Sequence, residues 1–134
     1  NETGYLWVPP DGWRRDERTP SKVHYHAPDG RQELGGFYAL ESGADLFTQW
    51  RNWERESHDQ EGYRRIRLER TTFRGREAVV WEYHFRKDGV AWRARQTGFN
   101  AGGKSYQLNI WYRPEVRSAA LRTYEAVSKS FTPL

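Results

Sequence analysis

The stretch from residue 63 to residue 112 decides the fold, and it reads YRRIRLERTTF-RG-REAVVWEYHF-RKDG-VAWRARQTGF-NAGGK-SYQLNIWY. Four runs in it are rich in aromatic and β-branched residues: Tyr63–Phe73, Arg76–Phe85, Val90–Phe99 and Ser105–Tyr112. Short glycine-containing segments separate these runs, which is the pattern of β-hairpins. The stretch therefore predicts a four-stranded antiparallel meander.

Alternation of side chains along a strand divides the meander into two sides, provided that each loop is tight. The pairs predicted on one side are Ile66–Tyr83, Leu68–Trp81, Tyr83–Trp92, Trp92–Tyr112, Ala94–Ile110 and Gln96–Leu108. This side is largely apolar, and each fully buried large apolar side chain contributes about 1.5–3 kcal/mol to folding. We therefore expect it to face the core.

The opposite side is largely charged. Its predicted pairs are Arg67–Glu82, Glu82–Arg93, Arg93–Trp111, Arg65–His84, Val80–Arg95 and Arg95–Asn109. A slip of one residue would mix the two sides, so the pattern specifies the register strongly.

This charged side is the predicted ligand-binding site. Its residues are Arg67, Glu82, His84, Arg93, Arg95 and Trp111. An aromatic ring beside several guanidinium groups can hold an anionic or sugar-like ligand, because arginine offers a planar fork of donors. The alternative is a solvated or covered surface on which Glu82 neutralises the arginines.

Further strands are expected before the meander. Residues 1–5 are predicted to form a flexible tail, and Arg14–Thr19 a charged connection. Lys22–Ala27 and Glu33–Leu40 are predicted strands, and Gly35-Gly36 inside the second favours a β-bulge.

Two helices complete the predicted fold, an α+β antiparallel sheet flanked by helices. Asp45 can cap a helix from Leu46 to about Ser57, whose stripe of Leu46, Trp50 and Trp53 is more typical of core than of a binding groove. Pro114 suits the first turn of a second helix. The apolar stripe of this helix is Val116, Ala120, Tyr124, Val127 and Phe131.

Composition excludes several classes of protein. The chain has 134 residues, the size of one domain, and no cysteine, so disulfides and thiolate metal sites are ruled out. No apolar run is long enough to cross a membrane. The net charge of +4 comes from interspersed acids and bases, which favours an ordinary soluble surface over nucleic-acid binding. Because no methionine or signal peptide opens the sequence, we expect an excised or mature domain.

The order of elements and several motifs resemble a known group. The motifs are Pro-Pro-Asp-Gly-Trp at 9–13, Tyr-His-Ala-Pro-Asp-Gly at 25–30, Trp-x-x-Trp-Glu at 50–54 and Gly-x-Glu-Ala-x-x-Trp-Glu-Tyr at 75–83. On the strength of these motifs and this order of elements, the chain resembles the Mog/PsbP-like domains of actinobacteria over most of residues 5–133. Such domains form the extracytoplasmic C-terminal part of membrane serine/threonine protein kinases. The resemblance implies a non-enzymatic sensing or binding role, but no catalytic or ligand residue can be carried over.

The leading prediction is therefore an extracytoplasmic sensing domain, attached to a membrane protein, with an unknown ligand or protein partner. No catalytic residue, cofactor or metal ligand set is indicated; His24 and His26 have a spacing that a metal could use, but no third ligand is evident. One alternative is a small enzyme that uses Glu82 and His84 in a pocket. Another is a module that binds single-stranded nucleic acid through arginine and stacked rings. Trp7 and Trp13 could be packed against a sheet edge or exposed for contact.

Overall fold

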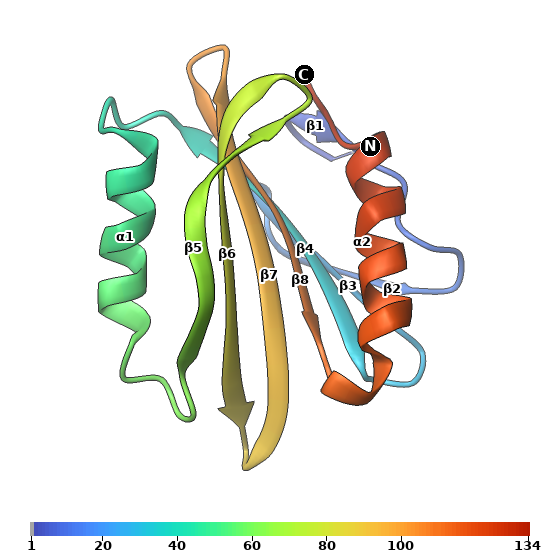
Figure 1. The fold of residues 1–134 in the computed structure, drawn as a ribbon. Coiled ribbons are helices and arrows are strands. Elements are labelled where there is room, and N and C mark those ends of the chain that lie inside the picture. Colours follow the sequence, from blue (N-terminus) through green and yellow to red (C-terminus); the bar gives the residue numbers. More distant parts are fainter. Residues whose placement is uncertain (1) are drawn as a thin grey trace.

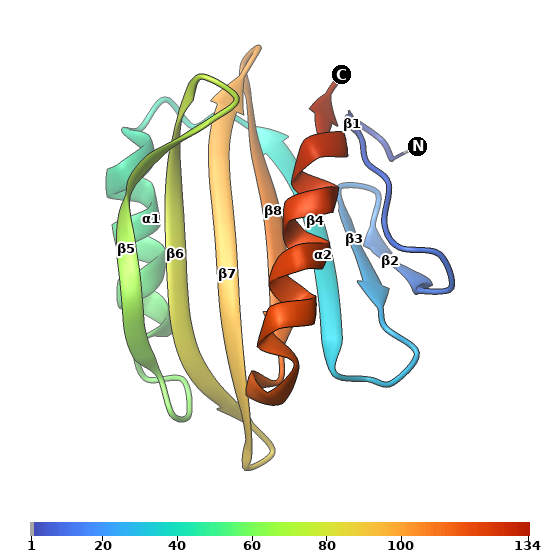
Figure 2. The same cartoon turned by 45° about the vertical axis from the view of Figure 1, so that its right-hand side comes forward.

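A seven-stranded antiparallel sheet forms the centre of the computed structural model, which describes residues 2–134 (Figures 1 and 2). Its order is β2-β3-β4-β8-β7-β6-β5. The bounds are β2 Arg14–Thr19, β3 Lys22–His26, β4 Gln32–Leu40, β5 Arg64–Phe73, β6 Arg76–Lys87, β7 Val90–Ala101 and β8 Lys104–Tyr112. The predicted α+β class with an antiparallel sheet and two main helices is confirmed.

The two helices lie on opposite faces of the sheet and over opposite halves of it (Figures 1 and 2). Helix α1, Leu46–Ser57, covers β5 and β6, and its first turn is capped as predicted by Asp45, whose Oδ2 accepts from the Thr48 amide at 3.0 Å. Helix α2, Arg117–Ser130, follows the short 3-10 helix η1, Pro114–Val116, and crosses β8 on the other face.

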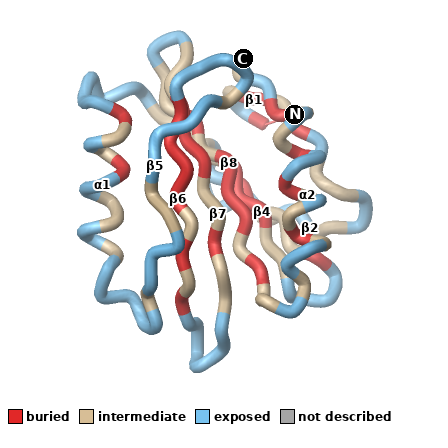
Figure 3. Tube along the Cα trace, in the orientation of Figure 1, coloured by how far each residue is buried: buried red, intermediate tan, exposed pale blue. Residues whose placement is uncertain are grey.

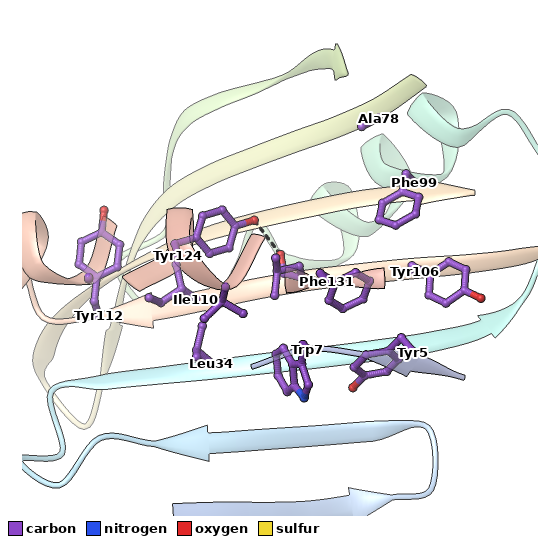
Figure 4. Packing of buried hydrophobic residues seen from close by; sticks show 13 residues of the cluster. Tyr5, Trp7, Leu34, Ala78, Phe99, Tyr106, Ile110, Tyr112, Tyr124 and Phe131 are labelled. Atoms are coloured by element: carbon purple, nitrogen blue, oxygen red, sulfur yellow. Dashed lines mark hydrogen bonds between the residues drawn. The ribbon is translucent and has the colours of Figure 1, made fainter. Parts of the chain in front are cut away.

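Each helix seals its own apolar cluster. The α1 cluster includes Leu46, Trp50, Val79, Trp81, Tyr83, Phe85 and Ala94. The α2 cluster includes Tyr5, Trp7, Leu34, Ala78, Phe99, Tyr106, Leu108, Ile110, Tyr112, Ala120, Tyr124, Val127 and Phe131 (Figure 4). Buried residues accordingly run along β6, β8 and the sheet-facing sides of both helices (Figure 3). Both sides of the sheet are therefore core in part, whereas the sequence predicted one apolar side and one charged side.

The predicted β7–β8 register is wrong by one residue. Ala94 pairs with Trp111, and Arg93 pairs with Tyr112. The cause is the turn: Gly102 and Gly103 both have positive φ, 57° and 80°, and form a two-residue hairpin loop, whereas the prediction allowed a longer loop. A one-residue slip exchanges the faces, so Tyr112, Ile110 and Leu108 lie under α2 and not with Trp81.

The other two hairpins differ from prediction with smaller consequences. Tyr83 pairs with Ala94, and Trp92 with Phe85, a slip of two residues that keeps Trp92 on the same face as Trp81. In β5, the predicted pairs Leu68–Trp81 and Arg67–Glu82 are confirmed. A bulge between Arg65 and Arg67 overturns the pairs Ile66–Tyr83 and Arg65–His84, and it leaves the Ile66 side chain 45% exposed.

Gly35 and Gly36 form no bulge, because their pairing with Asn109 and Leu108 is continuous. They make room for aromatic rings on the two faces instead. A Cβ on Gly35 would lie 2.7 Å from Cζ3 of Trp111, and one on Gly36 would lie 2.8 Å from Cζ of Tyr5. Glycine is required here by close approach and not by a change of register.

The N-terminal arm is packed against the core. Residue 1 of the predicted tail lies outside the described residues, but Glu2 and Tyr5 are buried, so the prediction of a tail is wrong for them. Strand β1, Tyr5–Leu6, pairs with β9, Thr132–Pro133, and Trp7 is buried against Phe131 of the α2 side. The charged connection at Arg14–Thr19 is the edge strand β2, whose charges protect an otherwise open edge.

Candidate functional site

The diagonal placement of the helices leaves two halves of the sheet uncovered. We call the first the charged half-face: it lies beside α2, over β5, β6 and β7, and carries Arg67, Glu82, His84, Arg93 and Arg95. We call the second the aromatic half-face: it lies on the α1 side of β3, β4, β7 and β8. It carries Lys22, His24, Glu33, Phe37, Gln96, Gln107, Asn109 and Trp111, with Phe85, Lys87, Trp92 and Arg18 at one end.

Five of the six predicted site residues share the charged half-face, but Trp111 does not. The β7–β8 register places Trp111 on the opposite face, beside Trp92 and the α1 cluster. The predicted aromatic ring beside the guanidinium groups is therefore absent. Tyr124 of α2 takes a comparable place, with its ring 5.9 Å from the Arg95 guanidinium carbon.

Glu82 neutralises the centre of the charged half-face. Its carboxylate accepts from Nε of Arg95 and forms an ion pair with Nε of Arg67 at 3.2 Å. Glu69 shares Arg67 at 3.0 Å. The sequence left two alternatives for this surface, a ligand site or a surface on which Glu82 neutralises the arginines. The ion pairs of Glu82 match the second alternative.

A hollow of about 380 Å³ lies between this surface and α2, and Arg67, Thr97 and Tyr124 contribute to its walls. Burial raises the pKa of Tyr124 far above the ordinary tyrosine value. Its hydroxyl lies 2.5 Å from the Thr97 hydroxyl. It also donates to the Leu108 carbonyl at 2.8 Å (Figure 4). A tyrosine held in this way stays protonated, and its hydrogen bonds join α2 to β7 and β8.

His84 lies toward the far end of the charged half-face. Its pKa is lowered by burial and by the neighbouring charges of Arg93 and Arg64. The ring is thus biased to its neutral form. The Glu82–His84 pair of the enzyme alternative is not assembled, since Glu82 is engaged by Arg67 and Arg95.

The aromatic half-face is built around a stack of two rings. The Trp111 and His24 rings are nearly parallel, with centroids 5.2 Å apart and an interplanar angle of 9°. Gly35 has no side chain, which leaves room for the edge of the Trp111 ring, and Glu33 binds Nδ1 of His24. Both rings are therefore fixed before any ligand arrives.

Two hollows flank this stack, and both rings line each of them. The first, of about 230 Å³, is walled by Phe37, Gln96, Gln107, Asn109 and Lys22. The second, of about 210 Å³, is walled by Phe85, Trp92, Lys87, Arg18 and Glu33. The first hollow is therefore rich in side-chain amides, and the second is rich in aromatic rings.

One residue that lines the first hollow has a buried polar atom without a partner. Asn109 is only 5% exposed, and its Oδ1 has no hydrogen-bond partner, while its Nδ2 donates to Oε1 of Gln107 at 3.2 Å. Gln96 accepts from the Tyr83 hydroxyl at 2.9 Å, which leaves its NH₂ group as a donor. Leaving a buried acceptor without a partner costs about 1–3 kcal/mol. Because Oδ1 of Asn109 is shielded from solvent, the side-chain amides open to a ligand in this hollow are those of the half-buried Gln96 and Gln107.

An ionic cluster borders the second hollow. His26 contacts Asp16 at 3.0 Å and Glu33 at 3.4 Å, and Arg18 contacts Glu33 at 3.4 Å. Burial alone would raise the pKa of Glu33, but the hydrogen bond from His24 and the nearby positive charges outweigh it and lower the pKa. Among residues 2–134, no group of three His, Cys, Asp or Glu side chains is arranged to hold a metal ion.

Sequence reasoning missed the aromatic half-face because it assigned Trp111 to the wrong side. Two signals in the sequence point to it. The Gly102-Gly103 pair specifies a two-residue turn, which fixes the register of Trp111. Gly35 in the middle of a strand signals close approach of another group, here Trp111 itself.

Similar structures share the fold at low sequence identity. LpqN, which is involved in cell envelope biogenesis of Mycobacterium tuberculosis, superposes with a TM-score of 0.71 at 16% identity, covering 96% of this chain and 83% of that one. CyanoP, the PsbP of Synechocystis sp. PCC 6803, gives 0.72 at 16% identity, covering 98% and 87%. A Pseudomonas aeruginosa protein, PA94, described as a putative regulator, gives 0.64 at 12% identity, covering 93% and 88%.

The family comparison covers nearly the whole chain. No curated protein is significantly similar to it in sequence. The family model for the serine/threonine kinase C-terminal domain matches residues 1–133. The described residues contain no helix that is long and apolar enough to cross a membrane. The fold is thus Mog/PsbP-like, and the chain belongs to the family of serine/threonine kinase C-terminal domains.

Proposed function

We propose that this chain is the extracytoplasmic ligand-binding or sensing domain of an actinobacterial membrane serine/threonine protein kinase. Membership of the kinase C-terminal domain family supports the attachment to a kinase. The shared fold of LpqN, a protein of cell envelope biogenesis, is compatible with a position outside the membrane. The observation that carries the binding role is the aromatic half-face, with its Trp111–His24 stack and the half-buried amides of Gln96 and Gln107 in the hollow beside it.

We propose further that the domain itself is not an enzyme. On the charged half-face Glu82 is engaged by Arg67 and Arg95, so it is not free to act as a general base beside His84. Binding of a ligand, or of a second copy of the domain, would change the proximity of kinase domains across the membrane. The charged half-face stays a predicted contact surface, now without Trp111.

The side of the membrane can be tested by labelling, because the chain contains no cysteine. Ser42→Cys places one thiol on an exposed loop of the full-length kinase. A membrane-impermeant maleimide added to intact cells should label this variant more strongly than the parent kinase, because the added thiol is the only one in residues 1–134. Labelling that appears only after lysis would contradict an extracytoplasmic position.

The sensing role requires a second measurement. Soluble cell-wall fragments added to cells, or to the full-length kinase in oriented vesicles, should change its autophosphorylation or its oligomeric state. A kinase that lacks residues 1–134 is the control and should not respond. An intact kinase whose phosphorylation and oligomeric state ignore all such fragments would contradict the proposal.

A further inference from the structure

The Trp111–His24 stack divides the aromatic half-face into two adjoining subsites. Each hollow, at about 230 and 210 Å³, is smaller than the roughly 300–1,000 Å³ of ordinary small-molecule sites, whereas the two together fall within that range. Both hollows share the two stacked rings as a wall. A ligand that fills the site therefore has at least two linked units, one on each side of the stack.

The first subsite favours groups that both donate and accept hydrogen bonds. Gln96 accepts from the Tyr83 hydroxyl through Oε1, which leaves its NH₂ group free to donate to a ligand. Gln107 accepts from Asn109 and retains its own NH₂ group. Sugar hydroxyl and acetamido groups complement such amides, since each can donate and accept at neighbouring atoms.

The second subsite favours a flat ring with apolar faces. Trp92 and Phe85 pack nearly parallel, with centroids 6.5 Å apart and an interplanar angle of 23°, and Trp111 provides the shared wall. Aromatic side chains offer rigid apolar area, against which the C–H faces of a pyranose ring can pack. The pairing of amides in one hollow with rings in the other suits an oligosaccharide.

The charge of the site is positive. Lys22 lines the first hollow and Lys87 the second, and neither forms an ion pair with an acid among the described residues. The one carboxylate that lines the second hollow, Glu33, is already shared by His24, His26 and Arg18. The free lysines therefore favour a ligand that carries its own negative charge.

We propose that the aromatic half-face binds an acidic oligosaccharide of at least two rings across the Trp111–His24 stack. One ring lies among the amides of Gln96, Gln107 and Asn109, and the next packs beside Trp92. The carboxylate of the glycan lies toward the lysines. This inference rests on the proposed function, because it names the ligand class of that same surface.

Calorimetric titration of the 134-residue chain tests the site directly. The probes are soluble di- and tetrasaccharide fragments of peptidoglycan glycan strands, which carry the muramic acid carboxylate, and neutral chitotetraose. We expect saturable binding of the acidic glycans that is tighter than that of chitotetraose. Trp111→Ala should weaken it by about tenfold or more, and the double variant Lys22→Ala/Lys87→Ala should remove most of the preference for acid.

Two controls keep the test independent of folding. Trp53→Ala removes a half-buried tryptophan of α1 outside both hollows and should leave glycan affinity unchanged. Gln107→Ala truncates a half-buried surface amide and should weaken binding with the fold intact, even if Trp111→Ala does not fold.

Absence of binding by every glycan, or wild-type affinity in both Trp111→Ala and Gln107→Ala, would overturn this assignment. Equal affinity for chitotetraose and the acidic glycans would overturn the requirement for a carboxylate. These failures differ from failure of the proposed function: glycan binding without any response of the full-length kinase would contradict the sensing role alone.

Discussion

At the scale of single residues, Glu2 is the most consequential charge in the N-terminal arm. Its carboxylate is almost fully buried, accepts from Nε1 of Trp7 at 2.9 Å and pairs with Arg15 at 2.5 Å. Burial alone would raise the pKa of Glu2, but these hydrogen bonds outweigh burial and lower the pKa below its ordinary value of 4.5. The ionised carboxylate of Glu2 therefore stabilises the packing of the N-terminal arm.

Glu2→Gln should destabilise the fold at neutral pH by about 1–3 kcal/mol, because it weakens a buried hydrogen-bonded ion pair. A carboxylate whose pKa is lowered by folding stabilises the folded state above its unfolded pKa, and the gain is lost as pH falls through the folded pKa. The difference between wild type and variant in urea denaturation should thus shrink below pH 4.5. If the stability difference between wild type and Glu2→Gln does not change with pH, the shape of the side chain and not its charge causes the loss. Glu17→Gln, at an exposed position, is the control.

Gly98 is the residue on which the packing of α1 against β7 depends. A Cβ there would lie 2.6 Å from Cε2 and 2.8 Å from Nε1 of Trp50, whose side chain is fully buried. Gly98→Ala should therefore cost about 1–3 kcal/mol of stability through overpacking. Thermal denaturation measures the loss, and the double variant Gly98→Ala/Trp50→Phe should lose less than the sum of the two single changes, because the shorter ring relieves the clash. Additive losses would rule out the contact.

At the scale of elements, the β7–β8 hairpin determines which side chains reach each face. A Cβ added at Gly102 or Gly103 would meet no atom within 4 Å, so only the positive φ values of these glycines constrain them. Gly103→Val should therefore destabilise the chain by roughly 1–2 kcal/mol for conformational reasons alone. Gly102→Asn should be close to neutral, because asparagine tolerates this conformation. Equal losses in both variants, measured by chemical denaturation, would contradict this account.

The same hairpin shows how far sequence reasoning reaches. The strands from Lys22 onward, α1 with its Asp45 cap and the buried stripe of α2 follow from local pattern and are confirmed, whereas strand β2 was predicted as a connection. The register does not follow, because it depends on which residues occupy a turn, and a slip of one residue moved Trp111 to the other face. The bulge at Ile66 is likewise invisible in the alternation of side chains.

The candidate site was predictable only in part for the same reason. That Glu82 pairs with arginines on both neighbouring strands follows from charge alone and is found, but its partner on β7 is Arg95 and not the predicted Arg93. The stack of Trp111 on His24 joins strands far apart in the sequence, and it required both the correct turn and the β4–β8 pairing. Such long-range coincidences have no local signal in one sequence.

At the scale of the whole molecule, Phe131 joins the arm, the C-terminal helix and the sheet. It is completely buried. Its ring packs on five others: Tyr5, Trp7, Phe73, Phe99 and Tyr106. Phe131→Ala should cost about 3–5 kcal/mol, a large part of the roughly 5–15 kcal/mol that stabilises a domain. Urea denaturation measures this, with the exposed Leu134→Ala as a control that should change stability by less than about 0.5 kcal/mol. A small loss in Phe131→Ala would mean that the arm and helix pack independently.

The pairing of β1 with β9 brings residues 5 and 133 together at one corner, opposite the β6–β7 hairpin (Figures 1 and 2). The architecture therefore does not depend on where the polypeptide is opened. A short linker could join the two ends there, and a new start at Gly89 would leave every neighbouring pair of strands intact. The termini of such a circular permutant would lie at the β6–β7 hairpin. A protein fused there would hold the domain in the reverse orientation.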